Sequence, residues 1–149
     1  MKKYEFTGEV KSWFGRTLHQ IRATISFGEV NVGDIGGWIE KEENLAHNGN
    51  AWVYGNAQVC DDAQVYGNAW VCNQAQWLCI GPVGSRSGFT TFFRTKDRKI
   101  FVSCGCFRGN IEEFTAKVQA THGESGHAKA YMAAIELAKI RIDLSEEES

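Results

Sequence analysis

A six-residue phrase repeats five times in the middle of this chain, between residues 51 and 80. Two of the copies read Ala-Trp-Val-Tyr-Gly-Asn and Ala-Gln-Val-Tyr-Gly-Asn. Alanine opens each copy, at positions 51, 57, 63, 69 and 75, and valine is third in four copies, at positions 53, 59, 65 and 71. A fixed period this short indicates one small structural unit stacked on itself.

Each copy has the residue types of a short strand that ends in a tight corner. Side chains alternate along a strand, so the first and third positions share one face and should point inward. The copies close with Gly-Asn, Asp-Asp or Asn-Gln, which tolerate the left-handed backbone of a sharp turn. We therefore predict a short parallel β-helix over residues 45–80.

Residues 1–44 precede the repeats and read as an N-terminal β cap. Apolar and polar residues alternate in two stretches, 3–10 and 17–27, which predicts two strands around a turn near Gly15. Such a cap is needed because the ends of a strand array expose unpaired edges.

Residues 86–145 follow the repeats and predict a ββαα module. A polar turn between two apolar runs indicates a hairpin. Asn110 and Glu113 have the spacing of a capping box, which indicates the start of a helix. The predicted elements are strands over 89–95 and 100–106, and helices over about 110–122 and 126–142.

Composition narrows the classes of partner and the compartment. The chain has 149 residues, a net charge of −2 and 43% hydrophobic residues, so it should pack a core and should not bind DNA directly. No apolar run approaches the roughly 20 residues of a membrane span, so no membrane partner is expected. Five cysteines without the spacing of a disulfide framework favour the cytoplasm.

The repeats resemble those of the hexapeptide-repeat family, whose left-handed parallel β-helix takes three copies, or eighteen residues, for each coil. The whole chain also resembles an uncharacterised protein type common in bacteriophages and prophages. The matching segments are residues 17–23, 36–40, the repeats, 92–97, 104–109 and 131–135. This resemblance implies a bacterial host cytoplasm and an accessory role, and small accessory proteins of this kind often bind a host defence protein or a signal molecule.

Trp52 and Trp70 are eighteen residues apart, so a three-copy coil would place them on neighbouring strands, about 4.8 Å apart. In the same way Tyr54 should lie over Cys72. The two tryptophans should leave the core and form a flat aromatic ladder. Either the terminal segments cover this ladder, or a partner, a second copy or a nucleotide base does. The other stacked pair expected beside the ladder is Gln58 and Gln76.

Cations gather around the predicted hairpin of the last segment. Arg94 and Arg108 lie near the helix start at Asn110, where a phosphate would be favoured. The alternative is a solvated turn. Lys96, Arg98 and Lys99 are the other members of this group.

Two further groups have a chemical interpretation beside a structural one. Cys104 and Cys106 share a strand face and, with His122 and His127, have the donors of a weak candidate Cys₂His₂ zinc site, and the favoured alternative is two buried thiols that pack as small apolar residues. His47 is the histidine of the repeat array and could be the general base of a hexapeptide-family acyltransferase, or an edge residue. No cofactor is expected.

We predict a non-enzymatic, phage-encoded accessory protein that inhibits a host defence system by binding a protein, and that associates with itself. One alternative is sequestration of a nucleotide second messenger. The other is an acyl-coenzyme A-dependent acyltransferase.

Overall fold

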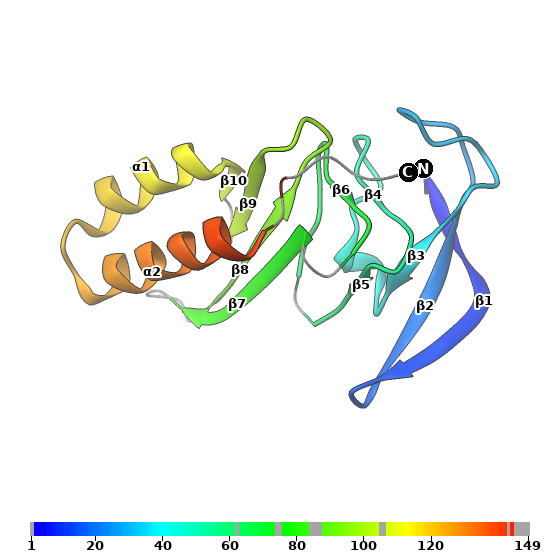
Figure 1. Ribbon diagram of the computed structural model, residues 1–149, viewed down its shortest axis with the longest axis horizontal. Helices are drawn as coiled ribbons and strands as arrows, with labels where there is room; N and C mark the ends of the chain where they lie inside the picture. Colours follow the sequence, from blue (N-terminus) through cyan, green and yellow to red (C-terminus); the bar gives the residue numbers. More distant parts are fainter. Residues whose placement is uncertain are drawn as a thin grey trace. The chain divides into compact units, whose positions relative to one another are not determined.

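The computed structural model describes residues 2–61, 63–73, 76–83, 88–104, 107–142 and 144. The chain divides into two compact units, Met1–Gln74 and Ala75–Ser149. In Figure 1 the first unit runs from blue to green and consists of strands and loops, whereas the second holds a sheet and the two helices.

The first unit is built on a four-stranded mixed sheet. Its first three strands are antiparallel, and the last pair is parallel with Trp38 opposite Gln58 and Ile39 opposite Val59. The order of the strands is β1 (Tyr4–Trp13), β2 (Arg16–Ala23), β3 (Ile35–Ile39) and β5 (Gln58–Val59).

The β1–β2 hairpin confirms the two strands predicted near the N-terminus, although β2 ends at Ala23. Within the described residues β1 pairs with β2 alone, so it is an edge strand. Its register shifts between Phe6 and Val10, and Gly8 within this bulge has a φ of +98°. Residues 24–34 form the loop that returns the chain to β3.

The alanines and valines of the repeats point inward. Two short strands, β4 (Trp52–Val53) and β6 (Trp70–Val71), pair in parallel with Trp52 opposite Trp70 and Val53 opposite Val71. The buried alanines and valines of the repeats are Ala51, Val53, Ala57, Val59, Ala63, Val65, Ala69 and Val71. Ala75 lies outside the described residues.

The predicted left-handed parallel β-helix over residues 45–80 is nevertheless wrong. The parallel pairs are only two residues long, and the larger sheets are mixed or antiparallel. The fold departs from the pattern where the copies stop being equivalent: β5 joins the sheet of the N-terminal hairpin through β3, and residues 77–83 form β7 of the second unit. The fifth copy lacks the third-position valine and the polar corner, so it continues as an extended apolar strand.

A buried asparagine ties the start of the array to its neighbours. Asn44 ends the 3₁₀ helix η1 (Glu42–Asn44) and has no exposed surface. Its Oδ1 accepts from the N–H groups of Glu40 (3.1 Å) and Lys41 (2.9 Å). Its Nδ2 donates to the carbonyls of Asp61 (3.1 Å) and Ala63 (2.9 Å). The side-chain amide of Asn44 therefore forms hydrogen bonds with four backbone groups. Buried polar groups require such partners.

The second unit contains an antiparallel sheet with two helices. Strands β8 and β9 confirm the predicted hairpin, while β7 begins within the fifth repeat copy and β10 is a strand that the sequence pattern did not indicate. The sheet has the order β10 (Phe107–Asn110), β9 (Ile100–Cys104), β8 (Gly88–Arg94), β7 (Trp77–Val83).

Both predicted helices are confirmed, as α1 (Ile111–His122) and α2 (Gly126–Arg141). The capping box forms as expected: Asn110 Oδ1 accepts from the N–H of Glu113 at 2.7 Å, and Glu113 Oε1 accepts from the N–H of Asn110 at 3.0 Å. Neither helix is long and apolar enough to cross a membrane. The core of this unit includes Phe92, Val102, Phe114, Val118, Tyr131 and Ile135.

Candidate functional site

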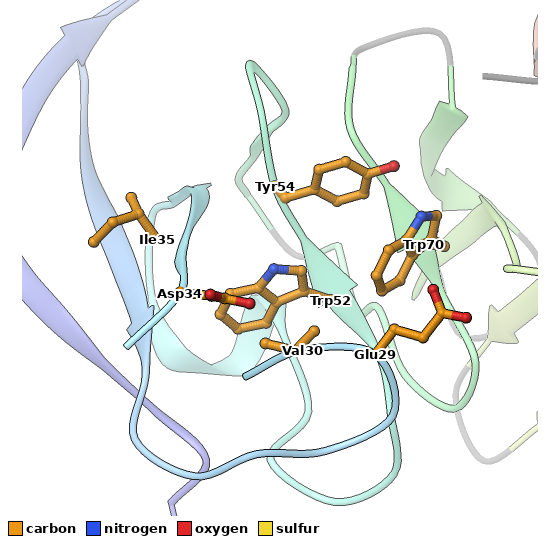
Figure 2. Close-up of a pocket in the computed structure, with 7 residues that line it drawn as sticks. All are labelled: Glu29, Val30, Asp34, Ile35, Trp52, Tyr54 and Trp70. Atoms are coloured by element: carbon orange, nitrogen blue, oxygen red, sulfur yellow. The ribbon is translucent and has the colours of Figure 1, made fainter. Parts of the chain in front are cut away.

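A pocket of about 290 Å³ in the first unit brings repeat aromatics together with the loop between β2 and β3 (Figure 2). We call it the ladder pocket. It gathers three residues that the sequence analysis selected for binding, Trp52, Tyr54 and Trp70. Its other lining residues are Glu29, Val30, Asp34 and Ile35.

Trp52 is buried, with 3% of its surface exposed. Phe27 packs edge-on against it, with ring centroids 5.4 Å apart and planes at 71°. A Cβ at Gly36 would lie 2.8 Å from Trp52 Cζ2 and 2.7 Å from the Val53 carbonyl oxygen, so only glycine lets β3 approach this closely. Of the two coverings considered for the ladder, the N-terminal segment provides the one at Trp52, because its loop between β2 and β3 covers the indole.

Tyr54 and Trp70 remain half-buried and form one wall of the pocket. Their ring centroids lie 4.9 Å apart with planes inclined at 49°, and Figure 2 shows the two rings beside each other. The Tyr54 N–H donates to the Val71 carbonyl at 2.9 Å, which fixes the backbone, while the Tyr54 ring lies against Trp70. Two inclined aromatic faces next to a buried indole make a contact surface for a planar or cationic group.

Glu29 lies in a tight turn that closes over the pocket. The Phe27 N–H donates to the Val30 carbonyl (2.9 Å) and the Val30 N–H donates to the Phe27 carbonyl (2.8 Å). Gly28 has a φ of +52°, a left-handed conformation that suits glycine at this position. Figure 2 shows the Glu29 carboxylate on the Trp70 side of the pocket.

Asp34 is the second acidic residue of the pocket. Its Oδ2 accepts from the N–H of Asn31 at 2.8 Å, and its own carbonyl accepts from the N–H of Ala23 at 2.9 Å. These bonds fasten the loop to the end of β2. Among the described lining residues the charged ones are Glu29 and Asp34, and none is basic.

The loop between β2 and β3 was not predicted to be part of the site. The available signal was Phe27-Gly28-Glu29-Val30, where two apolar residues flank a glycine turn as in a short hairpin. Asp34 and Glu29 were not selected, because exposed carboxylates in a loop are common.

The remaining predicted binding residues lie outside this pocket. Gln58 is on β5, where its strand partner is Trp38. Gln76 and Arg94 belong to the second unit and are buried, with 2% and 3% of their surfaces exposed. Arg108 is exposed on β10.

The helix start expected to favour an anion is already occupied by the chain. The side chains of Asn110 and Glu113 satisfy each other's N–H groups, and Glu112 adds negative charge to the first turn. Arg94 is buried rather than displayed on the hairpin. These features disfavour a phosphate at this end of α1.

Of the four residues considered for a zinc site, Cys106 lies outside the described residues. Cys104 Sγ accepts from Thr90 Oγ1 at 3.1 Å and lies 3.8 Å from the hydroxyl of Tyr131. Burial raises the pKa of Tyr131 to about 12. The ring of His122 is stacked on Tyr131 and lies 5.7 Å from the ring of His127. Within the part of the chain that is described, no group of three or more His, Cys, Asp or Glu residues could hold a metal ion.

His47 is used in packing and hydrogen bonding. Its Nδ1 accepts from the N–H of Lys3 at 3.2 Å, and its Nε2 lies 3.5 Å from Glu42 Oε1. Its ring stacks on Tyr4 with centroids 4.1 Å apart. Burial lowers the pKa of His47. Both ring nitrogens therefore face groups of the chain itself, which disfavours a role as general base.

One comparison with curated proteins gives a partial similarity. Over 62 residues the chain is 36% identical to the uncharacterized acetyltransferase YdcK of Escherichia coli strain K12. The matched segment covers 36% of this chain and 19% of that protein. The chain thus spans about a fifth of the length of this relative. No protein-family model matches the chain, and no solved structure matches it.

Proposed function

We propose that the first unit is a non-enzymatic protein-binding module, and that the ladder pocket takes up one side chain of a partner protein. The observation that carries this proposal is the pocket itself, in which half-buried Tyr54 and Trp70 stand beside buried Trp52. Aromatic side chains are enriched in the energetically dominant parts of protein interfaces. The fixed turn around Gly28 supports a preformed pocket, which lowers the entropic cost of binding.

Size and charge favour a side chain over a nucleotide. Small-molecule sites typically enclose about 300–1,000 Å³, and the ladder pocket has about 290 Å³. Glu29 and Asp34 would repel phosphate groups. These two properties support protein binding over sequestration of a nucleotide second messenger.

The identity of the partner follows from the resemblance and stays a prediction: a host defence protein met in the cytoplasm of a bacterial host. Association of the chain with itself also stays a prediction. Native mass spectrometry of the purified chain measures the oligomeric state, and burial of Trp52 means that an open tryptophan face is not the contact to expect.

Affinity capture with matched variants tests the proposal. Tagged wild type, Trp70→Ala and Phe14→Ala are incubated with bacterial lysate, and captured proteins are quantified by mass spectrometry. Phe14 is 80% exposed at the hairpin turn and is not a lining residue of the pocket, so it is the control for loss of an exposed aromatic ring.

We expect a partner that wild type and Phe14→Ala retain and Trp70→Ala loses, followed by the same ranking with the purified partner. Circular dichroism of each variant checks that the fold is kept. Equal capture by folded Trp70→Ala and wild type would remove the ladder pocket from the function.

The similarity to an acetyltransferase supports acyl transfer as a second candidate. Calorimetry with acetyl-coenzyme A, on wild type and His47→Gln, separates it from the first. Binding of the cofactor that depends on His47 would favour the enzyme, whereas no heat of binding favours the binding module. The contacts of His47 with Lys3 and Glu42 lead us to expect no heat of binding.

A further inference from the structure

We propose that the group bound in the ladder pocket is a guanidinium, supplied by an arginine side chain of a partner protein. This inference rests on the proposed function and adds the chemical class of the ligand. Three observations carry it: the sign of the charge in the pocket, the arrangement of the aromatic faces and the fixed backbone of the loop.

The charge of the pocket selects a cation. Glu29 and Asp34 are both exposed and both line the pocket, with no basic residue among the described lining residues. Asp34 Oδ2 already accepts from the N–H of Asn31, which orients the carboxylate and leaves Oδ1 to accept from a ligand. Carboxylates and guanidinium groups form charge-assisted hydrogen bonds, which are stronger than neutral ones.

The aromatic faces select a planar cation. Trp70 and Tyr54 are inclined at 49° with centroids 4.9 Å apart, so a flat group can lie on one face while it touches the other. A cation over an aromatic ring is attracted by the negative face of the π system, most strongly by tryptophan. A guanidinium also stacks on such faces and donates from a planar fork, whereas an ammonium group is a compact, strongly hydrated charge.

The loop holds these groups in place before any ligand arrives. The paired hydrogen bonds between Phe27 and Val30 fix the turn that carries Glu29, and the bond from Ala23 fixes Asp34. At the first residue of the turn, the Nζ of buried Lys3 lies 4.6 Å from the centroid of the Phe27 ring, and this cation–π contact helps to hold the turn in place. A preformed acidic and aromatic pocket is the arrangement that a single arginine requires.

The test is an NMR titration that follows the tryptophan indole N–H signals. The probes are N-acetyl-arginine methylamide, the lysine analogue and the citrulline analogue, which keeps the shape of arginine without its charge. Trp13 and Trp77 lie outside the pocket and provide internal reference signals. The variants are Glu29→Gln and Asp34→Asn, with Glu9→Gln as the control for an exposed carboxylate elsewhere.

We expect arginine to shift the signals of Trp52 and Trp70, lysine to shift them less, and citrulline to leave them unchanged. Each site variant should weaken arginine binding about fivefold, and Glu9→Gln should not, because a partly exposed charge contact is modest. Added salt should weaken binding as well.

The two proposals fail separately. Equal shifts with citrulline and arginine would overturn the guanidinium while keeping the pocket as a binding site. Trp70-dependent capture of a partner, without any shift of the indole signals by arginine, would also overturn the guanidinium and keep the pocket as a binding site. Absence of both the arginine shifts and the Trp70-dependent capture would overturn the inference and the proposed function together.

Discussion

The buried lysine near the N-terminus gives a quantitative prediction about stability and pH. Lys3 has 1% of its surface exposed, and its Nζ donates to the carbonyls of Ala51 (2.6 Å) and Gly49 (3.3 Å). Burial lowers its pKa from 10.5 to about 8. Each pKa unit corresponds to about 1.4 kcal/mol, so the charged form is disfavoured in the folded state by at most about 3.5 kcal/mol.

The sign follows from proton counting. Between pH 8 and 10.5 the unfolded chain holds the proton of Lys3 and the folded chain releases it. The free energy of unfolding contributed by Lys3 therefore rises with pH across this window, and it is constant below it. Cys60 acts in the opposite direction, because burial raises its pKa to about 11. The two effects partly cancel in the free energy of unfolding of the wild type. A variant without the Lys3 ammonium group is therefore needed to isolate the contribution of Lys3.

The assay is urea denaturation of wild type and Lys3→Met at half-unit steps from pH 7 to 11, in the presence of a reductant. Loss of the two hydrogen bonds should lower the stability of Lys3→Met by a roughly constant amount of about 1–3 kcal/mol. On top of this, the stability of wild type relative to the variant should grow by up to about 3.5 kcal/mol between pH 8 and 10.5. A difference that does not change with pH would refute the reasoning that Lys3 is buried with a lowered pKa.

Substitutions at Asn44, Gly36 and Asn110 test the packing and the helix cap, with Gly88→Ala as a control. Asn44→Asp should destabilise the first unit about as much as Asn44→Ala, by about 3 kcal/mol or more in urea denaturation, because a carboxylate cannot donate to the carbonyls of Asp61 and Ala63. Gly36→Ala should cost about 1–3 kcal/mol by thermal unfolding, because the added Cβ meets backbone and side-chain atoms at 2.6–2.8 Å. Gly88→Ala, which meets nothing within 4 Å, should leave the melting temperature nearly unchanged. Asn110→Ala should cost about 1 kcal/mol through loss of the helix cap to Glu113, measured as a shift in urea midpoint.

The second unit was the easier part to predict, because its signals are local. Asn110 and Glu113 form the capping box that their spacing indicates, and Gly123 follows the last residue of α1. By contrast, β7 was read as the fifth copy of the repeat. Its pairing with β8 depends on contacts between strands, which a six-residue period cannot reveal.

In the repeats, the inward positions were predictable and the architecture was not. The period alone places Ala51 and Val53 in the core, and the eighteen-residue spacing pairs Trp52 with Trp70. The fold depends instead on which strands join which sheet, and β5 pairs with β3 from outside the array.

Only part of the candidate site could be predicted from the sequence. Trp52 and Trp70 were found through their spacing, but Glu29 and Asp34 were not, because they approach the tryptophans through a loop that has no periodic pattern. Lys3 was also missed, since nothing in the sequence around it indicates that an ammonium group would satisfy carbonyls of the repeats.

The bulge in β1 has a consequence for assembly. An outermost strand with free amide and carbonyl groups is a template on which a neighbouring molecule can lay down its own backbone. In β1 the shift between Phe6 and Val10, centred on Gly8, interrupts that row of donors and acceptors. A strand of a second molecule cannot form a continuous set of hydrogen bonds with β1, so edge-to-edge pairing between sheets of two molecules is disfavoured at this strand.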